Sequence, residues 1–380
     1  MKKLLKTTLP IALVLVLIFL FIQPNPYFRR AIYYFTADIS DHKIFPERIV
    51  EKGDHQPWKI SSKFNVYQLS SDDIHLMDSF QTTAFIVIKD TSLIFESYWD
   101  GYSENAKSSS FSMAKSIVSL LIGIAIDEGL IESVDDPVSK YIPEFENKKY
   151  NISIRDLLVM GSGLKWNESY FNPFSVTTKA YYGKNVNKLA LYAKSIKPPA
   201  QVYEYITANP QLLSIILKNV TNKPISEYAS EKLWKPLGAK NDATWSLDQE
   251  NGDEKAFCCF NSNARDFARI GQLVLNNGMW NGKQIISNSY LKEALTPATF
   301  LVDNENNPVD FYGYQWWIGS YKEIKFYYAR GILGQYIVII PEKNMVFVRL
   351  GHKRSKNKIN HHREDIFHYI DLALKISNKN

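Results

Sequence analysis

The stretch SFSMAKSIVSLLIGIAIDEG, residues 110–129, places a serine and a lysine three residues apart at the start of an apolar pattern. Apolar residues recur at helical spacing after Ser112, and Gly129 supplies a stop, so the stretch predicts a helix. Residues three apart share a helix face. Ser112 and Lys115 can therefore aim a hydroxyl and an amine at one spot in the first turn, where unpaired N–H groups favour negative charge. This predicts an activated serine nucleophile. The alternative is an N-cap serine beside a solvated lysine.

Strand patterns flank this helix on both sides in the sequence. TAFIVIKD (83–90) and LIFESYWD (93–100) are apolar, β-branched and aromatic runs that predict a hairpin. Late in the chain, three further runs predict strands, and a terminal helix is expected over 363–377. The three late runs are KFYYARG (325–331), GQYIVIIP (334–341) and MVFVRLG (345–351).

The middle of the chain is mostly helical in pattern. Apolar residues at helical spacing predict helices over 154–164, 209–222 and 263–278. Strands, a long helical middle, then strands and a helix predict an α+β fold. We expect one antiparallel sheet built from both ends of the chain and flanked by helices, with a mostly helical lobe. A cleft between sheet and lobe is the expected place for a site.

Composition predicts a globular body. The chain has 380 residues, 45% hydrophobic and 14% aromatic, which argues against global disorder. The net charge of +6 belongs mainly to the first 30 residues, which hold five Lys or Arg and no acid. We therefore infer no nucleic-acid partner.

The N-terminus predicts a targeting segment. Lys2, Lys3 and Lys6 precede an apolar run over 9–22, and no A-x-A cleavage site follows. We expect residues 1–24 to be an uncleaved signal anchor that holds the protein at a membrane, with a cleaved signal peptide as the alternative. The body would then lie outside the cytoplasm, in the periplasm or at the cell surface. Residues 25–60, rich in proline and charge, are expected to form a stalk, followed by one domain over 61–377.

Two features suggest metal or redox chemistry only weakly. Cys258 and Cys259 are adjacent, a spacing that suits neither an ordinary disulfide nor a common zinc site, so we expect two small buried residues. HHREDIFH (361–368) is expected to form a solvated helix face with charge pairs. We therefore predict no metal and no cofactor.

Serine acyl chemistry needs partners beyond Ser112. Lys115 can act as a base only if it is neutral, which requires burial or neighbouring cations. A tyrosine could share the proton transfer, and PPAQVYEYITANPQLL (198–213) offers Tyr205. The Ser112 N–H would be one oxyanion donor. A second is expected from YARGILGQY (328–336), where glycines allow a strand to approach a ligand closely.

These residues occur within phrases that resemble the serine β-lactamase-like hydrolases: class C β-lactamases, penicillin-binding DD-peptidases, related esterases and 6-aminohexanoate-dimer hydrolases. The resemblance spans about residues 80–350. SFSMAKS is similar to the S-x-x-K motif of that family, YEYITAN to its Y-x-N motif and ARGILGQY to its K-T-G motif. Supporting phrases are DDPVSKYIPEF (135–145), IRDLLVMGSGLKW (154–166), ARDFARIGQLVLNNGMWNGKQIIS (264–287) and YGYQWW (312–317).

The resemblance implies roles for particular residues. Ser112 would be the nucleophile, Lys115 its base and Tyr205 the Y of Y-x-N. The N–H groups of Ser112 and Ile332 would form the oxyanion hole. Further substrate contacts are expected from Arg330, Gly331, Trp316, Trp317 and Tyr181.

Two departures bear on the substrate. Thr207 stands where the family has asparagine, and Ala329 and Arg330 stand where it has lysine and threonine. Those family residues help hold a substrate carboxylate, so the departures argue against β-lactam hydrolysis. Arg330 could grip a carboxylate itself or form a structural ion pair. The resemblance favours a hydrolase of a small-molecule ester, amide or peptide. Alternatives are a penicillin-binding DD-peptidase or β-lactamase, and a non-catalytic binding protein with the same fold.

Overall fold

The computed structural model describes residues 26–170 and 172–379, together with Pro10, Ile11, Val14, Leu15 and Ile18. The predicted signal anchor over 1–24 lies mostly outside these residues. Within the part of the chain that is described, no helix combines the length and the hydropathy that crossing a bilayer requires.

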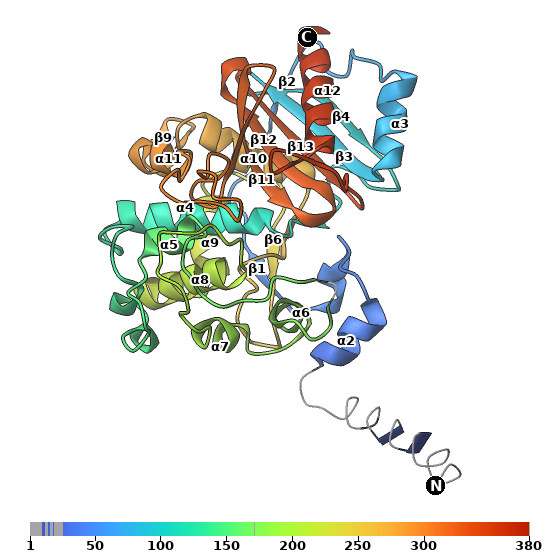
Figure 1. The fold of residues 1–380 in the computed structure, drawn as a ribbon. Helices are drawn as coiled ribbons and strands as arrows, with labels where there is room; N and C mark the ends of the chain where they lie inside the picture. Colours follow the sequence, from blue (N-terminus) through green and yellow to red (C-terminus); the bar gives the residue numbers. More distant parts are fainter. Residues whose placement is uncertain (1–9, 12–13, 16–17, 19–25, 171, 380) are drawn as a thin grey trace.

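The centre of the molecule is a seven-stranded sheet built from both ends of the chain, as the sequence predicts (Figure 1). Neighbouring strands are antiparallel, except that β2 runs parallel to β4. The early hairpin joins the late strands where Val87 pairs with Phe347. In sheet order, the strands are β10 (Trp317–Tyr321), β11 (Ile324–Gly331), β12 (Gln335–Ile340), β13 (Met345–Gly351), β3 (Thr82–Lys89), β4 (Ser92–Tyr98) and β2 (Lys59–Ile60).

Helices cover both faces of this sheet. Side chains alternate along a strand, so neighbouring residues of β13 face opposite layers. Phe347 packs on Phe85, which in turn packs on Tyr369 of α12. Val346 instead faces Gly271 of α10. The covering helices are α3 (Ser71–Ser79) and α12 (Asp365–Lys379) on one side, and α10 (Ala264–Leu275) and α4 (Met113–Asp127) on the other.

Helix α4 lies between the sheet and the helical lobe (Figure 1). It contacts β11 and β12 on one side and α8 on the other, and every residue from Met113 to Ala125 is buried. A helix that is apolar all round is stable only when it is enclosed in this way. The remaining helices are α5 (Ile154–Leu158), α6 (Val176–Tyr182), α7 (Val186–Leu191), α8 (Ala208–Thr221), α9 (Ile225–Ala229) and α11 (Asn288–Ala294).

The expected stalk over 25–60 differs from the structure, in which residues 26–60 belong to the folded body. Helix α2 (Tyr27–Tyr34) contacts α6, and Ile39, Phe45 and Val50 are buried. β1 closes one edge of a second, four-stranded sheet. Short strands carry too little periodicity to be recognised in sequence. This sheet contains, in order, β1 (Glu47–Val50), β6 (Ala243–Ser246), β7 (Phe260–Ser262) and β5 (Ser108–Ser109).

Two further pairs of short strands lie at the periphery, and one of them corrects a prediction. His361 and His362 belong to the segment before α12, and His362 is buried, so HHREDIFH is not a solvated helix face. The pairs are β8 (Met279–Trp280) with β9 (Lys283–Gln284), and β14 (Lys358–Ile359) with β15 (His362–Arg363).

The two cysteines are buried, as expected, but they are not thiols. Cys258 and Cys259 form a disulfide between adjacent residues, which corrects the prediction from spacing. Cys259 has φ of 67°, in the left-handed region. The pair lies in a turn directly after Phe257 and before β7.

Candidate active site

Ser112 and Lys115 lie at the start of α4 with their polar atoms in contact. Ser112 is the N-cap residue, and the Lys115 Nζ donates to its Oγ at 3.0 Å. Nζ also donates to the carbonyl oxygen of Phe257 at 2.8 Å. The Lys115 side chain is 1% exposed. The alternative of a solvated lysine is therefore excluded, and the amine is held against the serine from two sides.

Burial sets the charge of this amine. Desolvation lowers the pKa of Lys115 to about 8, and the charge of Glu168 acts in the opposite direction. A neutral amine is thus accessible close to neutral pH. That meets the requirement that Lys115 must fulfil to accept a proton from Ser112.

Tyr205 joins the pair from the helical lobe. The Lys115 Nζ lies 5.1 Å from the centroid of the Tyr205 ring. Burial raises the pKa of Tyr205 to about 12, and a hydrogen-bond contribution from Ser112 lowers it. The phenol is therefore protonated at neutral pH. Its ring is flanked by Trp317 at 5.7 Å and Tyr312 at 6.0 Å between centroids, which fixes its orientation.

The end of β11 is brought to the start of α4 by a glycine. A Cβ on Gly331 would lie 2.3 Å from the Ser110 carbonyl oxygen, so only glycine permits this approach. The next residue is Ile332, whose N–H is the predicted second oxyanion donor. The approach therefore places the Gly331–Ile332 peptide beside the segment that carries Ser112.

The turn after Ile332 is held by two buried side chains that the sequence did not single out. Arg349 donates to the carbonyl oxygens of Leu333 and Gly334 at 3.0 and 2.8 Å. Gln335 Nε2 donates to the Ile332 carbonyl at 3.1 Å. Leu333 has φ of 62°, a conformation that such bonds must maintain. Both residues lie in strands whose apolar pattern conceals their polar role.

Of the other predicted substrate-contact residues, some lie near Tyr205 and others are buried away from it. The Arg330 guanidinium stacks 3.2 Å from the Trp317 ring centroid and donates to the His361 carbonyl at 3.0 Å. Trp317 thus connects Arg330 to Tyr205. Trp316 is fully buried in the main core. Tyr181 is also buried and donates to Asp41 at 2.7 Å, which does not fit its predicted contact with the substrate.

Glu168 is a site residue that sequence reasoning missed. Its carboxylate accepts hydrogen bonds from the backbone N–H and the hydroxyl of Thr207, both at 2.7 Å. It also accepts from the Tyr170 hydroxyl at 2.7 Å. Thr207 is the N-cap of α8, two residues after Tyr205. The only hint of this contact in the sequence is Thr207, which stands where the resembling family has asparagine.

One of the segments that resemble the family, YGYQWW (312–317), has a structural role. The Gln315 side-chain amide donates to the carbonyl oxygens of Leu157 and Leu158 at 3.0 and 2.7 Å, and the Gln315 backbone carbonyl accepts from the Ser116 hydroxyl at 2.6 Å. YGYQWW therefore connects α5 to α4. Among the described residues there is no group of three or more His, Cys, Asp or Glu side chains with the arrangement of a metal site.

The chain belongs to the Beta-lactamase family, because the family model matches residues 74–366. It is a hydrolase of the serine β-lactamase-like group, and its α+β fold is the one that this group shares.

Individual relatives support this assignment. The 6-aminohexanoate-dimer hydrolase of Paenarthrobacter ureafaciens is 28% identical over 293 residues, which cover 71% of this chain and 72% of that protein. A Bacillus anthracis protein assigned as a 6-aminohexanoate-dimer hydrolase shares the fold with a TM-score of 0.72 and 21% identity, covering 91% of this chain and 94% of that chain. An octameric penicillin-binding protein homologue from Pyrococcus abyssi has a TM-score of 0.63 at 20% identity, over 82% and 78% of the two chains.

Proposed function

We propose that this chain cleaves an ester or amide through an acyl-enzyme formed on Ser112. The observation that carries the proposal is the 3.0 Å contact between the Ser112 hydroxyl and the buried amine of Lys115. Burying a charged amine costs free energy, so an amine enclosed against a hydroxyl is favoured in its neutral form, the form that a base requires. One relative, at 28% identity, is named a 6-aminohexanoate-dimer hydrolase, and this name supports an amide or ester as the scissile bond.

The proposed reaction begins when neutral Lys115 takes the proton of the Ser112 hydroxyl. The oxygen attacks the substrate carbonyl carbon, and the resulting oxyanion accepts hydrogen bonds from the N–H groups of Ser112 and Ile332. Tyr205, protonated at neutral pH, donates a proton to the leaving oxygen or nitrogen and regains one from Lys115. Water then cleaves the acyl–serine ester along the same proton path.

Mass spectrometry of the intact protein tests this proposal. The wild-type chain, incubated with p-nitrophenyl esters and a panel of β-lactams, should gain the mass of an acyl group on Ser112. Ser112→Ala should gain none, and its rate should fall by several orders of magnitude. Ser119→Ala, in the same helix but facing Tyr290, is the matched control and should keep its activity.

The adduct also separates the alternatives. A lasting penicilloyl adduct would favour a penicillin-binding peptidase, and β-lactam turnover would favour a β-lactamase. A Ser112→Ala protein that still hydrolysed esters at the wild-type rate would end the proposal. Failure of an active-site serine probe to label the wild type would favour a non-catalytic binding protein.

We also propose that the body lies outside the cytoplasm, held at the membrane by residues 1–24. The support is the sequence alone: a basic start, an apolar run and no small-residue cleavage site. Fractionation of cells that express the full chain, with N-terminal sequencing of the product, tests both points. Recovery in the cytosolic fraction with an intact N-terminus would contradict the proposal.

A further inference from the structure

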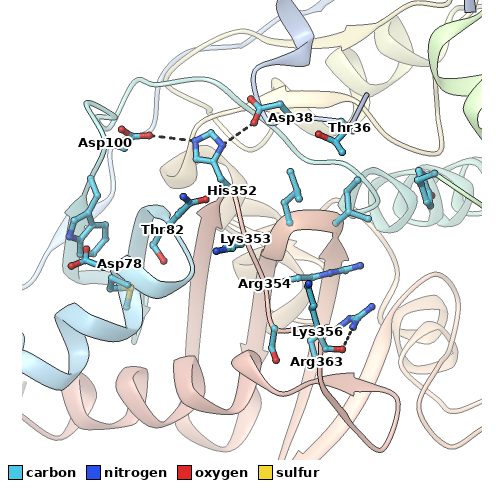
Figure 2. A pocket seen from close by; sticks show the side chains of 18 residues that line it. Thr36, Asp38, Asp78, Thr82, Asp100, His352, Lys353, Arg354, Lys356 and Arg363 are labelled. Atoms are coloured by element: carbon cyan, nitrogen blue, oxygen red, sulfur yellow. Dashed lines mark hydrogen bonds and ion pairs between the residues drawn. The ribbon is translucent and has the colours of Figure 1, made fainter. Parts of the chain in front are cut away.

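A cavity of about 1160 Å³ opens beside Ile332, the proposed second oxyanion donor. Tyr170 from the loop that carries Glu168 also lines it. Figure 2 shows four basic side chains gathered in this cavity, and none of them has a part in the proposed reaction. They are Lys353, Arg354, Lys356 and Arg363.

These cations have no carboxylate partners in the part of the chain that the structure describes. Across the described residues, no Asp or Glu oxygen lies within ion-pair distance of any of the four, nor of the neighbouring Arg330 and Lys358. Arg363 also has a buried Nε with no hydrogen-bond partner. Arg354 reaches toward the oxyanion strand, with Nη1 3.5 Å from the Gly331 carbonyl. The cluster is therefore both unneutralised and adjacent to the proposed reaction centre.

The cations also affect one another. Burial lowers the pKa of Lys358, and Arg363, Arg330 and Arg354 lower it further. Like charges that lie this close raise the free energy of the folded chain unless an anion enters. A ligand that carries negative charge would weaken this repulsion.

Most acidic side chains around the cavity are engaged elsewhere, but Asp78 also lines it (Figure 2) and forms no ion pair among the described residues. Asp38 and Asp100 lie on either side of His352, 3.0 and 3.6 Å from its ring nitrogens, away from Arg354 and Arg363 (Figure 2). Glu364 accepts hydrogen bonds from Ser355 and Asn357. Asp365 accepts from Tyr336 at 3.0 Å, and its Oδ1 is buried without a partner. Four cations and three carboxylates line the cavity, and two of those carboxylates are paired with His352, so a positive excess remains around Arg354 and Arg363.

We propose that this cavity is a subsite for a phosphate group carried by the substrate next to its scissile ester or amide bond. The inference rests on the proposed function, because it places the bond at Ser112. Guanidinium groups bind phosphate oxygens through paired hydrogen bonds, and several together match a group of more than one negative charge better than a single carboxylate. A membrane surface is disfavoured because Arg354 and Arg363 are partly buried within a cavity.

Binding of inorganic phosphate tests the subsite without any hydrolysis. Titration calorimetry of the wild-type chain should show saturable binding that weakens with added salt. The double variant Arg354→Gln, Arg363→Gln should bind at least about tenfold more weakly. Lys343→Gln, an exposed lysine beyond the far end of β12, is the matched control and should bind like the wild type. If the double variant loses its thermal transition, Lys353→Gln with Lys356→Gln replaces it.

A pair of esters tests the link to the reaction. The wild type should hydrolyse 4-acetoxyphenyl phosphate with a kcat/KM at least about tenfold above that for 4-methoxyphenyl acetate. The double variant should lose this preference, measured as the ratio of the two kcat/KM values, in which any common change in rate cancels. Phosphate binding in a protein that forms no acyl-enzyme would leave the subsite standing and remove the proposed function.

Three results would overturn the subsite. One is equal phosphate affinity in the wild type and the double variant. Another is acetate binding as tightly as phosphate, which would point to a carboxylate. The third is binding to phosphatidylglycerol vesicles that the double variant loses while both esters react unchanged, which would assign the cations to a lipid surface.

Discussion

At the scale of single residues, the protonation of Lys115 governs the proposed chemistry. Its pKa of about 8 predicts that kcat/KM rises with pH through about 8, because only the neutral amine accepts the serine proton. Tyr205, with a pKa of about 12, should not limit the rate below pH 10. A pH profile measured with an ester that does not ionise checks this. A profile that falls between pH 7 and pH 9 would contradict it.

Glu168 should shift that profile. Its negative charge raises the pKa of Lys115, so Glu168→Gln should move the rising limb to lower pH. The variant also loses charge-assisted acceptors for the Thr207 N–H and hydroxyl, and we expect a modest loss of stability of about 1–2 kcal/mol. The position of the pH limb distinguishes the two effects, because a purely structural role would lower the rate without moving it. Glu204→Gln, in a partly exposed pair with Lys197, is the control.

At the scale of elements, the junction between β11 and α4 positions the site. Gly331→Ala would bring a methyl group to 2.3 Å from the Ser110 carbonyl oxygen, so one of the two elements must move. Displacing an oxyanion donor costs about 10²–10³-fold in rate, and we expect kcat to fall by that amount. Gly319→Ala on β10 is the comparison, because the atoms nearest its Cβ belong to the Phe326 and His362 side chains and not to the backbone. If Gly331→Ala kept the wild-type kcat, the assignment of Ile332 to the oxyanion hole would be wrong.

The elements that sequence reasoning located correctly are those with strong local patterns. The hairpin of β3 and β4, the late strands and helices α4, α8, α10 and α12 all have a clear period of two or 3.6. The elements it missed are held by distant partners. β1 pairs with β6, almost 200 residues later, and its four residues have no distinctive period.

The residues of the candidate site divide in the same way, into those predicted by local spacing and those held by distant partners. Ser112 and Lys115 are neighbours on one helix, so their contact could be derived from spacing. Glu168 and Arg349 form hydrogen bonds to residues distant in the sequence, so no local pattern predicts their roles. The disulfide between Cys258 and Cys259 was missed because spacing rules describe the common bridges, and this one needs a particular turn.

At the scale of the whole molecule, α12 completes one face of the sheet. Nine of its residues are buried, and seven of these are hydrophobic, among them Phe367, Tyr369 and Ile376. Burial of each large apolar side chain contributes about 1.5–3 kcal/mol, so losing the helix removes about as much as the whole stability of a domain. A chain ending at Glu364 should therefore show no cooperative thermal transition by circular dichroism. Removing only residues 378–380 should leave the midpoint nearly unchanged, and a cooperative transition in the shorter chain would contradict this account.

The pairing of Val87 with Phe347 also determines when the central sheet can complete its folding during translation. Ribosomes add about 5–20 residues per second, so β3 waits roughly 13–50 s for its neighbour to be translated. Throughout that interval an apolar strand edge is open to any other nascent chain. The early hairpin is therefore the part of the nascent chain most open to pairing with a wrong strand, and slower translation lengthens that interval.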